Sequence, residues 1–447
     1  MKQYNDYFWR AKNAALDMMM RLFTYIAIFF LVFTVSPLYI RAGIIDDLRQ
    51  KIDTRGAEIK NLEQEIAQYE KDIAVLGGQA KTLANSIKEL DIARKKLDVN
   101  IRLTESKILN QNLKIEKLEL EIGDKEVKID QNSRAIGEII RSMDQVETKN
   151  LTEVILSNEN FSELWDDIEN LELLGNQIRD QVKELQQLKA ARESDKAATE
   201  KERAVLVGLK KELSDEKRVV ENNKSGKNRL LATTKNKESN YKKILQQKQA
   251  LKEAFEAELQ QFESELKVAI DPSSFPPAGS EVLSWPLDNV RITQQFGKTS
   301  DSGRLYASGT HNGIDLAATY AKIRATLGGT VTGVGDTDIV CPGASYGRWV
   351  LVKHRNGLST LYAHLSVISV TSGQEVGTGD IIGYSGGQIG TPGAGYSTGP
   401  HLHLTVFATQ GVEIQSKKSK VCQGTYTMPF ATKLNAYLDP MDYLKKL

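Results

Sequence analysis

Residues 45–73 read IDDLRQKIDTRGAEIKNLEQEIAQYEKDI, with isoleucine at every seventh position. The same spacing continues without a slip to Ile136, and isoleucine occupies twelve of its fourteen positions. The second apolar position of the heptads is mostly leucine and includes Leu48, Leu62, Leu76, Leu83, Leu90, Leu97, Leu118 and Ile139. An apolar repeat sustained over so many turns predicts a left-handed coiled coil. At the rise of an α-helix, the repeat would extend for about 140 Å.

A second, more highly charged helical stretch follows, and together the two occupy residues 44–268. Asn222-Asn223-Lys224-Ser225-Gly226-Lys227 predicts an interruption in it. Two stretches of similar length predict an antiparallel hairpin, with its break near residues 150–170, where Phe161 and Trp165 lie. Parallel homodimerisation through the first stretch is the alternative, because isoleucine and leucine in these positions also favour two-stranded coils. The last part of the second seam is Leu251, Phe255, Leu259, Phe262 and Leu266.

The N-terminal region contains a segment long enough to cross a membrane. Residues 22–40, LFTYIAIFFLVFTVSPLYI, form an uncharged run behind a polar leader at residues 1–21. One helix of this length spans a bilayer. No clean A-x-A cleavage site follows, which favours a retained single-pass anchor over a cleaved signal peptide.

Composition separates the chain into two parts. The 447 residues include 59 lysines and arginines and 58 aspartates and glutamates, a formal charge of +1. That balance excludes a general nucleic-acid-binding protein, which would carry a basic excess. Of ten prolines only Pro37 precedes Pro272, and 24 of 33 glycines lie at or after Gly279. All five histidines follow residue 310, so metal or acid–base chemistry is expected only in the C-terminal part.

A linker at residues 269–282 separates the helices from a different kind of sequence. Pro272 blocks continuation of the helix, and the proline, serine and glycine around it are typical of a linker. Short β-rich runs separated by glycine follow, such as Trp349-Val350-Leu351-Val352. Residues 283–447 are therefore predicted to form one β-rich domain.

Two motifs in this domain suit a metal ion. His311 and Asp315 are four residues apart, and Gly313 between them favours extended or turning backbone. His401 and His403 are two residues apart, so on a strand both rings would point to one face. Two histidines and a carboxylate with an open coordination position form a catalytic zinc set, which lowers the pKa of bound water. The remaining histidines could then move protons or stabilise an oxyanion.

These motifs carry a resemblance to the LytM/lysostaphin-type zinc endopeptidases. The matching segments are Gly309–Asp315, Tyr362-Ala363-His364-Leu365 and Thr398-Gly399-Pro400-His401-Leu402-His403. The resemblance covers about residues 283–447 and implies a small antiparallel β-sheet domain with a groove, hydrolysing peptide bonds in peptidoglycan. It also implies that His311, Asp315 and His403 bind Zn²⁺, and that His364 and His401 are catalytic.

The whole architecture resembles the EnvC/PcsB-like murein hydrolases, which join an extracytoplasmic coiled coil to such a domain. This implies a bacterial cell-membrane protein active in wall remodelling or cell division, with the coiled coil and peptidase domain outside. It further implies a membrane partner of the FtsEX transporter type, acting through the coiled coil. Two alternatives stay open, namely secretion after signal cleavage, and a coiled-coil activator or scaffold that recruits another murein hydrolase.

The domain departs from the resembled pattern in several places. Leu404-Thr405-Val406 follows His403, where family members commonly have Phe-Glu-Val. Extra residues occur around 336–345, 388–396 and 410–429, and two of these segments contain Cys341 and Cys422. Two cysteines in an exported domain predict one disulfide, with two free thiols as the alternative. His354 precedes the turn Asn356-Gly357 and is predicted to be structural.

Overall fold

The computed structural model of the protein describes residues 36–77, 82–147, 161–264, 266, 268–297, 311–388 and 391–447. Contacts divide the chain into two compact units, Met1–Ile59 with Ser106–Lys210, and Lys60–Glu105 with Lys211–Leu447. None of the helices in the described ranges is long and apolar enough to cross a membrane. The leader at 1–21 and most of the predicted anchor at 22–40 lie outside the described residues.

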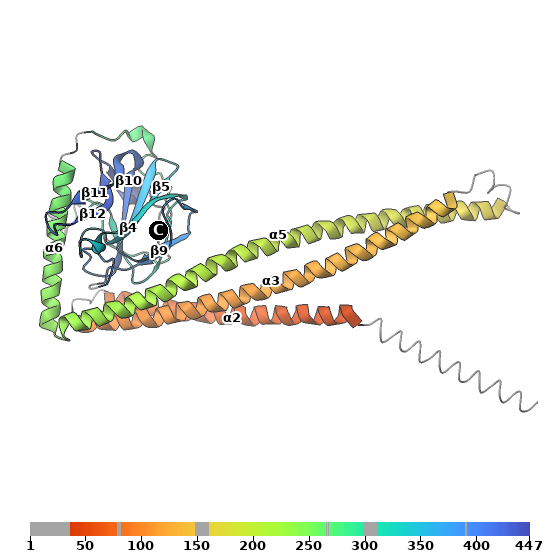
Figure 1. The fold of residues 1–447 in the computed structure, drawn as a ribbon, viewed down its shortest axis with the longest axis horizontal. Coiled ribbons are helices and arrows are strands. Elements are labelled where there is room, and N and C mark those ends of the chain that lie inside the picture. The colour runs from red at the N-terminus through yellow and green to blue at the C-terminus, as the bar shows by residue number, and fades with distance from the viewer. Residues whose placement is uncertain are drawn as a thin grey trace, which may run out of the picture. The chain divides into compact units, whose positions relative to one another are not determined.

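The first apolar repeat forms two helices, so the prediction of one unbroken rod is wrong. Helix α2 (Ser36–Gly77) ends before helix α3 (Leu83–Glu147) begins (Figure 1). Lys96 of α3 pairs with Glu70 of α2 at 2.8 Å, so the chain has reversed direction between the two helices. The sequence signal for this reversal is Gly77-Gly78, a dipeptide typical of turns. The heptad phase continues in α3, which hid the reversal.

The antiparallel hairpin between the two long stretches is confirmed. Helix α5 (Phe161–Thr234) runs alongside α3 in the opposite direction. Lys125 of α3 pairs with Asp195 of α5 at 2.5 Å, and Glu119 of α3 pairs with Arg203 of α5 at 2.8 Å. From Glu119 to Lys125 the residue numbers rise along α3, while those of the partners fall along α5, so the two helices are antiparallel. Residues 148–160, which include part of the predicted break, and the side chains of Phe161 and Trp165 lie outside the described parts.

The predicted interruption at residues 222–227 is not observed, because α5 continues to Thr234. Instead the helix ends where Lys235 and Asn236 adopt positive φ values of 50° and 56°. The polar residues that suggested a break make tertiary contacts. The side-chain amide of Asn223 donates to the Leu90 carbonyl at 3.1 Å, and that of Asn222 to the Ser366 carbonyl at 2.8 Å. These bonds outweigh the low helix propensity of asparagine.

Residues 268–447 form the β domain, whose main sheet has eight antiparallel strands in the order β1-β2-β10-β6-β5-β4-β8, with β13 paired to β10. These strands are β1 (Ile292–Gln294), β2 (Ile314–Ala317), β4 (Gly329–Asp336), β5 (Arg348–His354), β6 (Leu358–Ala363), β8 (Glu375–Val376), β10 (His401–Ala408) and β13 (Tyr437–Leu438). Smaller sheets join β3 (Lys322–Arg324), β9 (Ile381–Ser385) and β7 (Leu365–Ile368), and pair β11 (Val412–Lys418) with β12 (Thr425–Ala431). The prediction of a β-rich domain with an antiparallel sheet is confirmed.

Both faces of the main sheet are buried. Successive side chains on each strand alternate between the two faces, and each face belongs to an apolar cluster. One face carries an apolar cluster that includes Val350, Val352 and Leu404. The other contributes Trp349 and Phe407 to a second cluster.

Helix α6 (Glu238–Ser264) and the β11–β12 hairpin cover this second face. Phe255 of α6 meets Tyr426 edge to face at 6.5 Å between ring centroids, and Phe262 meets Phe430 at 6.0 Å. The seam of residues 251–266, expected to belong to the coiled coil, therefore packs against the β domain. Only the tertiary structure shows which surface covers this apolar stripe.

A disulfide joins Cys341 to Cys422, with 5.7 Å between their Cα atoms, so the predicted pairing is confirmed. It links two segments at the second apolar cluster, in which Cys341 is buried and against which Cys422 packs. The segment before Cys422 also contacts α6, because the Ser419 hydroxyl and the Lys420 amide donate to the Glu258 carboxylate at 2.7 and 2.5 Å. The disulfide therefore strengthens the part of the domain on which α6 rests.

Candidate metal centre and active site

Strands β2 and β10 bring the two sequence motifs together. In their antiparallel register, His403 lies directly opposite Asp315. Opposite residues of an antiparallel pair share one face of the sheet, so their side chains meet. His311 precedes β2 and is held by two backbone hydrogen bonds to Gly297, at 2.8 and 3.0 Å. Its Nδ1 atom lies 2.9 Å from the carbonyl oxygen of Gln295, which leaves Nε2 facing the other two side chains.

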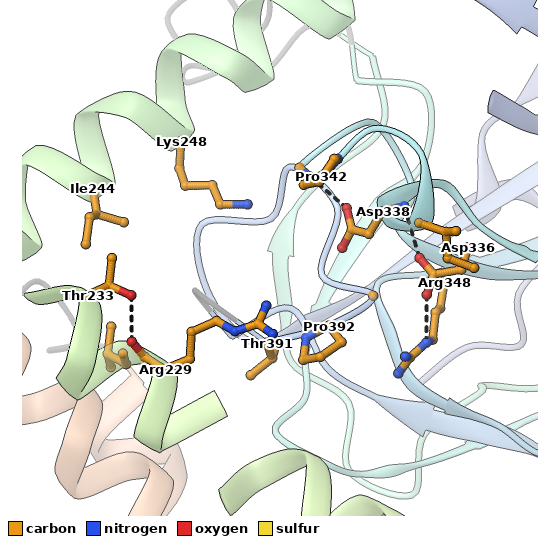
Figure 2. Close-up of a pocket in the computed structure, with 14 residues that line it drawn as sticks. Arg229, Thr233, Ile244, Lys248, Asp336, Asp338, Pro342, Arg348, Thr391 and Pro392 are labelled. Atoms are coloured by element: carbon orange, nitrogen blue, oxygen red, sulfur yellow. Dashed lines mark hydrogen bonds and ion pairs between the residues drawn. The ribbon is translucent and has the colours of Figure 1, made fainter. Parts of the chain in front are cut away.

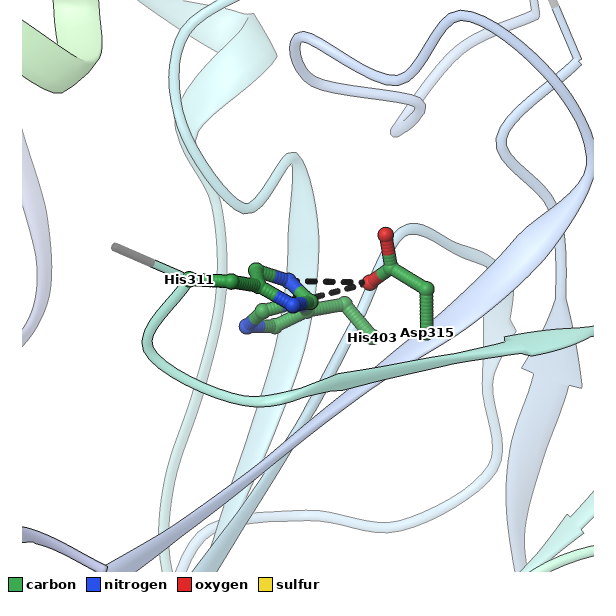
Figure 3. A group of neighbouring side chains, drawn as sticks. All are labelled: His311, Asp315 and His403. Carbon is green, nitrogen blue, oxygen red and sulfur yellow. Dashed lines mark hydrogen bonds and ion pairs between the residues drawn. The ribbon is translucent and has the colours of Figure 1, made fainter. Parts of the chain in front are cut away.

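Figure 3 shows that His311, Asp315 and His403 converge on one point. Nε2 of His311 lies 3.1 Å from Nδ1 of His403 and 3.3 Å from Oδ1 of Asp315, and the last two atoms are 2.9 Å apart. Ligand atoms around a tetrahedral ion such as zinc lie about 3.3 Å apart. The three side chains therefore fit a metal ion of this kind.

The charge states of Asp315 and His403 also suit a metal. Burial on its own would raise the pKa of Asp315, but His401 and His311 nearby bring it well below its usual value, so the carboxylate is ionised. Burial lowers the pKa of His403 to about 4, so its imidazole is neutral at pH 7. Metal ligands must be deprotonated in this way.

His364 is held beside this centre in an unusual conformation. It connects β6 to β7 with φ of +60°, a region that non-glycine residues rarely adopt. The residue is fully buried, and neither ring nitrogen has a hydrogen-bond partner among the described residues. Burial and the neighbouring His401 and His403 keep its pKa well below its usual value. Strain and an unsatisfied buried polar group are typical of functional positions.

His401 completes the group. Its ring lies 4.8 Å from that of His364 between centroids. Nδ1 lies 2.9 Å from the carbonyl oxygen of Gly399, to which it can donate, and Nε2 lies 3.6 Å from Oδ1 of Asp315. Burial lowers the pKa of His401, so a neutral ring presents its Nε2 lone pair to the centre. The structure thus brings together all five residues singled out from the sequence.

Other contacts in the site were not evident from the sequence. The Tyr346 ring stacks on His403 at 5.8 Å, and its hydroxyl accepts a hydrogen bond from the Asn312 amide at 3.1 Å. The Tyr396 ring packs against His364 at 5.5 Å. Both tyrosines lie in segments that appeared to be additions or their margins, and no spacing rule connects them to the histidines. Only their place in the fold reveals them.

Helix α6 contributes a cation next to these rings. Nζ of Lys252 lies 5.4 Å from the centroid of Tyr396 and 3.8 Å from the carboxylate of Glu256, and both charged side chains are largely buried. The ammonium also contributes to lowering the pKa of His364, after burial and the two neighbouring histidines. The α6 helix is therefore part of the surroundings of the site.

A separate pocket of about 490 Å³ lies between α5, α6 and two loops of the β domain. Figure 2 shows Arg229 and Lys248 on the helices, and Asp338 on the facing loops. The Asp338 carboxylate accepts hydrogen bonds from the backbone amides of Gly343 and Gly395, at 2.7 and 3.0 Å. None of the five site residues lines this pocket, so it is distinct from the metal centre.

His354 is structural, as its position in a hairpin predicts. It is buried at the end of β5, with Nε2 2.8 Å from the Thr360 hydroxyl and Nδ1 3.2 Å from the Gly328 carbonyl oxygen. Burial lowers its pKa to about 4.

Comparison with known proteins identifies this domain. Residues 309–416 match peptidase family M23. The β domain is an M23 peptidase domain. The matched range contains all five site residues.

Curated relatives share the M23 domain. The chain is 39% identical over 119 residues to the DD-carboxypeptidase/endopeptidase Mpg of Neisseria meningitidis serogroup B, covering 26% of this chain and 24% of that protein. It is 35% identical over 146 residues to the peptidoglycan DD-endopeptidase ShyA of Vibrio cholerae, covering 31% and 29%. The match thus spans less than a third of the length of either relative.

Solved structures are also similar to part of the chain. The catalytic domain of the prophage-encoded M23 protein EnpA from Enterococcus faecalis is 27% identical, with a TM-score of 0.23, over 30% of this chain and 88% of that one. The catalytic domain of lysostaphin from Staphylococcus simulans is 24% identical, with a TM-score of 0.24, over 34% and 91%.

Proposed function

We propose that this chain is a membrane-anchored zinc endopeptidase that hydrolyses peptide cross-links of bacterial peptidoglycan. The observation that carries the proposal is the triangle of His311, Asp315 and His403 beside His364, which is buried and has no hydrogen-bond partner among the described residues. The names of Mpg and ShyA support the substrate class, since both are called endopeptidases and ShyA a peptidoglycan DD-endopeptidase.

The metal would be held by Nε2 of His311, Nδ1 of His403 and Oδ1 of Asp315, the atoms that converge. Zinc bound by two histidines and a carboxylate keeps a coordination position open, polarises a carbonyl group and lowers the pKa of water to about 7. His403 is buried and its imidazole is neutral at pH 7, so it can bind the metal without first losing a proton.

The two other histidines have separate tasks. The Nδ1 proton of His401 is directed to the Gly399 carbonyl, so Nε2 can take a proton from the attacking water and return it to the leaving amine. Neither ring nitrogen of His364 has a partner within the described part of the chain, and we assign its N–H to the oxygen of the scissile carbonyl as negative charge develops there. Because His364 is fully buried, such a hydrogen bond would be strong.

The remaining parts of the proposal concern location and partners. Residues 22–40 would anchor the protein in the cell membrane, with the coiled coil and the M23 domain outside, in wall remodelling or division. A transporter of the FtsEX type as partner of the coiled coil rests on the sequence resemblance alone. A homodimer rests on the isoleucine and leucine positions of the first heptad stretch.

The test is mass analysis of the fragments released from purified sacculi by the chain lacking its first 43 residues. Products with a new amine and carboxyl at the former cross-link, formed only with zinc, are expected. The matched control is His364→Ala, which should bind zinc and release nothing. Cleavage of glycan strands would contradict the proposal. Zinc binding without release, combined with stimulation of a second hydrolase, would favour the activator function instead.

A further inference from the structure

The second ring nitrogen of His403 has a partner that the metal chemistry does not use. Nδ1 faces Asp315 and His311, as described, whereas Nε2 lies 2.9 Å from the hydroxyl oxygen of Thr405. Both side chains are buried, His403 at 1% and Thr405 at 0% exposure, so solvent does not compete for this contact.

The position of the hydroxyl follows from the strand. Thr405 is two residues beyond His403 on β10, so the two side chains share one face of the sheet. Strand β10 pairs with β2 on one side and with β6 on the other, which fixes the strand. Thr405 lies opposite Leu361 of β6. The β-branched side chain of threonine has restricted χ1 freedom, so its oxygen is held next to the ring.

The contact determines where the ring carries its proton. A neutral imidazole has one N–H and one lone pair, and a metal at Nδ1 requires the lone pair there. The proton then lies on Nε2 and is donated to Thr405. His311 shows the same arrangement with its nitrogens exchanged, since its Nδ1 faces the carbonyl of Gln295 at 2.9 Å. That partner is backbone, so of the two contacts only the one at Thr405 depends on the identity of a side chain.

We propose that Thr405 is a positioning residue, whose hydroxyl holds His403 in the tautomer and orientation that bind the metal. The inference rests on the proposed zinc function and adds a side chain that touches neither metal nor substrate. Hydrogen-bond partners of this kind typically contribute 10–100-fold to metal affinity.

The test measures zinc affinity of the full-length chain in detergent by competition with a chelator. Thr405→Val, which keeps the shape and removes the hydroxyl, is expected to weaken zinc binding by about 10-fold or more. Thr405→Ser restores the hydroxyl and should bind within a few-fold of wild type. The absorption spectrum of the cobalt-substituted protein provides a second readout and should change in Thr405→Val but not in Thr405→Ser.

The matched control is Thr360→Val on the neighbouring strand. Its hydroxyl lies 2.8 Å from Nε2 of His354, so it removes the same kind of contact from a histidine that binds no metal. It should lower thermal stability and leave zinc affinity unchanged.

If wild type binds no zinc, the proposed function itself fails. If wild type binds and Thr405→Val binds equally well, or if Thr360→Val loses as much affinity, the inference is overturned. If Thr405→Val does not fold, Thr405→Ala replaces it in the same measurement. Thr405→Ser remains decisive in either case, because weak zinc binding by a folded serine variant would also contradict the proposal.

Discussion

The histidines of the M23 domain differ in what their two ring nitrogens contact. His311 and His403 each direct one nitrogen to the metal centre and the other to a fixed oxygen. His364 has no partner at either nitrogen within the described residues, and His401 keeps Nε2 available to the centre. The proposed division into metal ligands and residues that move or donate protons rests on this difference.

The first prediction follows from this division. His311→Ala, Asp315→Ala and His403→Ala should each lose bound zinc. His364→Ala and His401→Ala should keep zinc and lose turnover by about 10²- to 10⁴-fold, because proton transfer or oxyanion stabilisation fails. The measurements are metal content by mass spectrometry and the release of wall fragments. Equal zinc content in wild type and all three ligand variants would refute the assignment.

A second prediction concerns His354. Its pKa is about 4 in the folded protein because burial disfavours the charged form, against 6.5 in the unfolded chain. Below pH 6.5 the unfolded state therefore binds the extra proton, and the folded state loses stability until the pH reaches about 4. Between pH 7 and pH 5 this histidine should lower the free energy of unfolding by about 2 kcal/mol.

The measurement is urea denaturation of wild type and His354→Gln at both pH values. The variant should be less stable at pH 7 and should lose less stability on acidification. Identical losses in the two proteins would show that other groups account for the acid sensitivity.

Among the secondary-structure elements, helix α6 contributes to the buried core of the M23 domain. Phe255 is 2% exposed and belongs to the apolar cluster under the β11–β12 hairpin. A fragment of residues 280–447, which contains the whole domain predicted at 283–447, would lack α6 and expose this cluster. The predicted domain boundary at residue 283 thus omits a helix that buries much of one sheet face.

The third prediction tests this role. Phe255→Ala should lower the free energy of unfolding of the M23 domain by about 4 kcal/mol, because a buried aromatic ring leaves a cavity. Gln247→Ala, at an exposed position of the same helix, should change it by less than about 0.5 kcal/mol. The fragment 238–447 should unfold at a higher temperature than 280–447 by calorimetry. Equal melting temperatures of the two fragments would show that α6 is dispensable.

Within the larger compact unit, the long helices contact the segment that leads to the active site. Gly226 of α5 packs against Thr391 so closely that an added Cβ would lie 2.4 Å from the threonine methyl group. Asn222 binds the Ser366 carbonyl. These contacts restrain the segment that carries Tyr396, and Tyr396 packs on His364.

The fourth prediction is that the helices slow the enzyme. On the same sacculi and at equal zinc occupancy, residues 44–447 should act more slowly than 238–447, which keeps α6 but lacks α5. Gly226→Leu in the longer chain should raise the rate, because the side chain forces α5 away from Thr391. Gly208→Leu is the matched control, since nothing lies within 4 Å of a Cβ at that glycine. Equal rates for the two chains would leave the helices only a positioning role.

The sequence by itself determined those features that depend on local spacing. The heptads predicted long helices, because the apolar pattern repeats within a few turns. The antiparallel hairpin was the favoured one of two pairings that the sequence left open, and the ion pairs between α3 and α5 decide for it. Strand alternation and the histidine motifs predicted a metal site in this domain, since His401 and His403 share a face on any strand. The assignment of His311, Asp315 and His403 as its ligands came from the family resemblance and remains a prediction. The cysteine pair was also predicted correctly, because only two cysteines are present.

Only the tertiary structure decided which surface covers each apolar stripe. The repeat of residues 45–139 was compatible with one rod or with a reversal at Gly77, because the heptad phase is the same in both. Residues 222–227 lacked helix propensity, but hydrogen bonds to Leu90 and Ser366 stabilise the helix there. The seam on α6 packs on a sheet rather than on a helix. Periodicity shows that a face must be buried, whereas its partner is set by contacts between residues far apart in the chain.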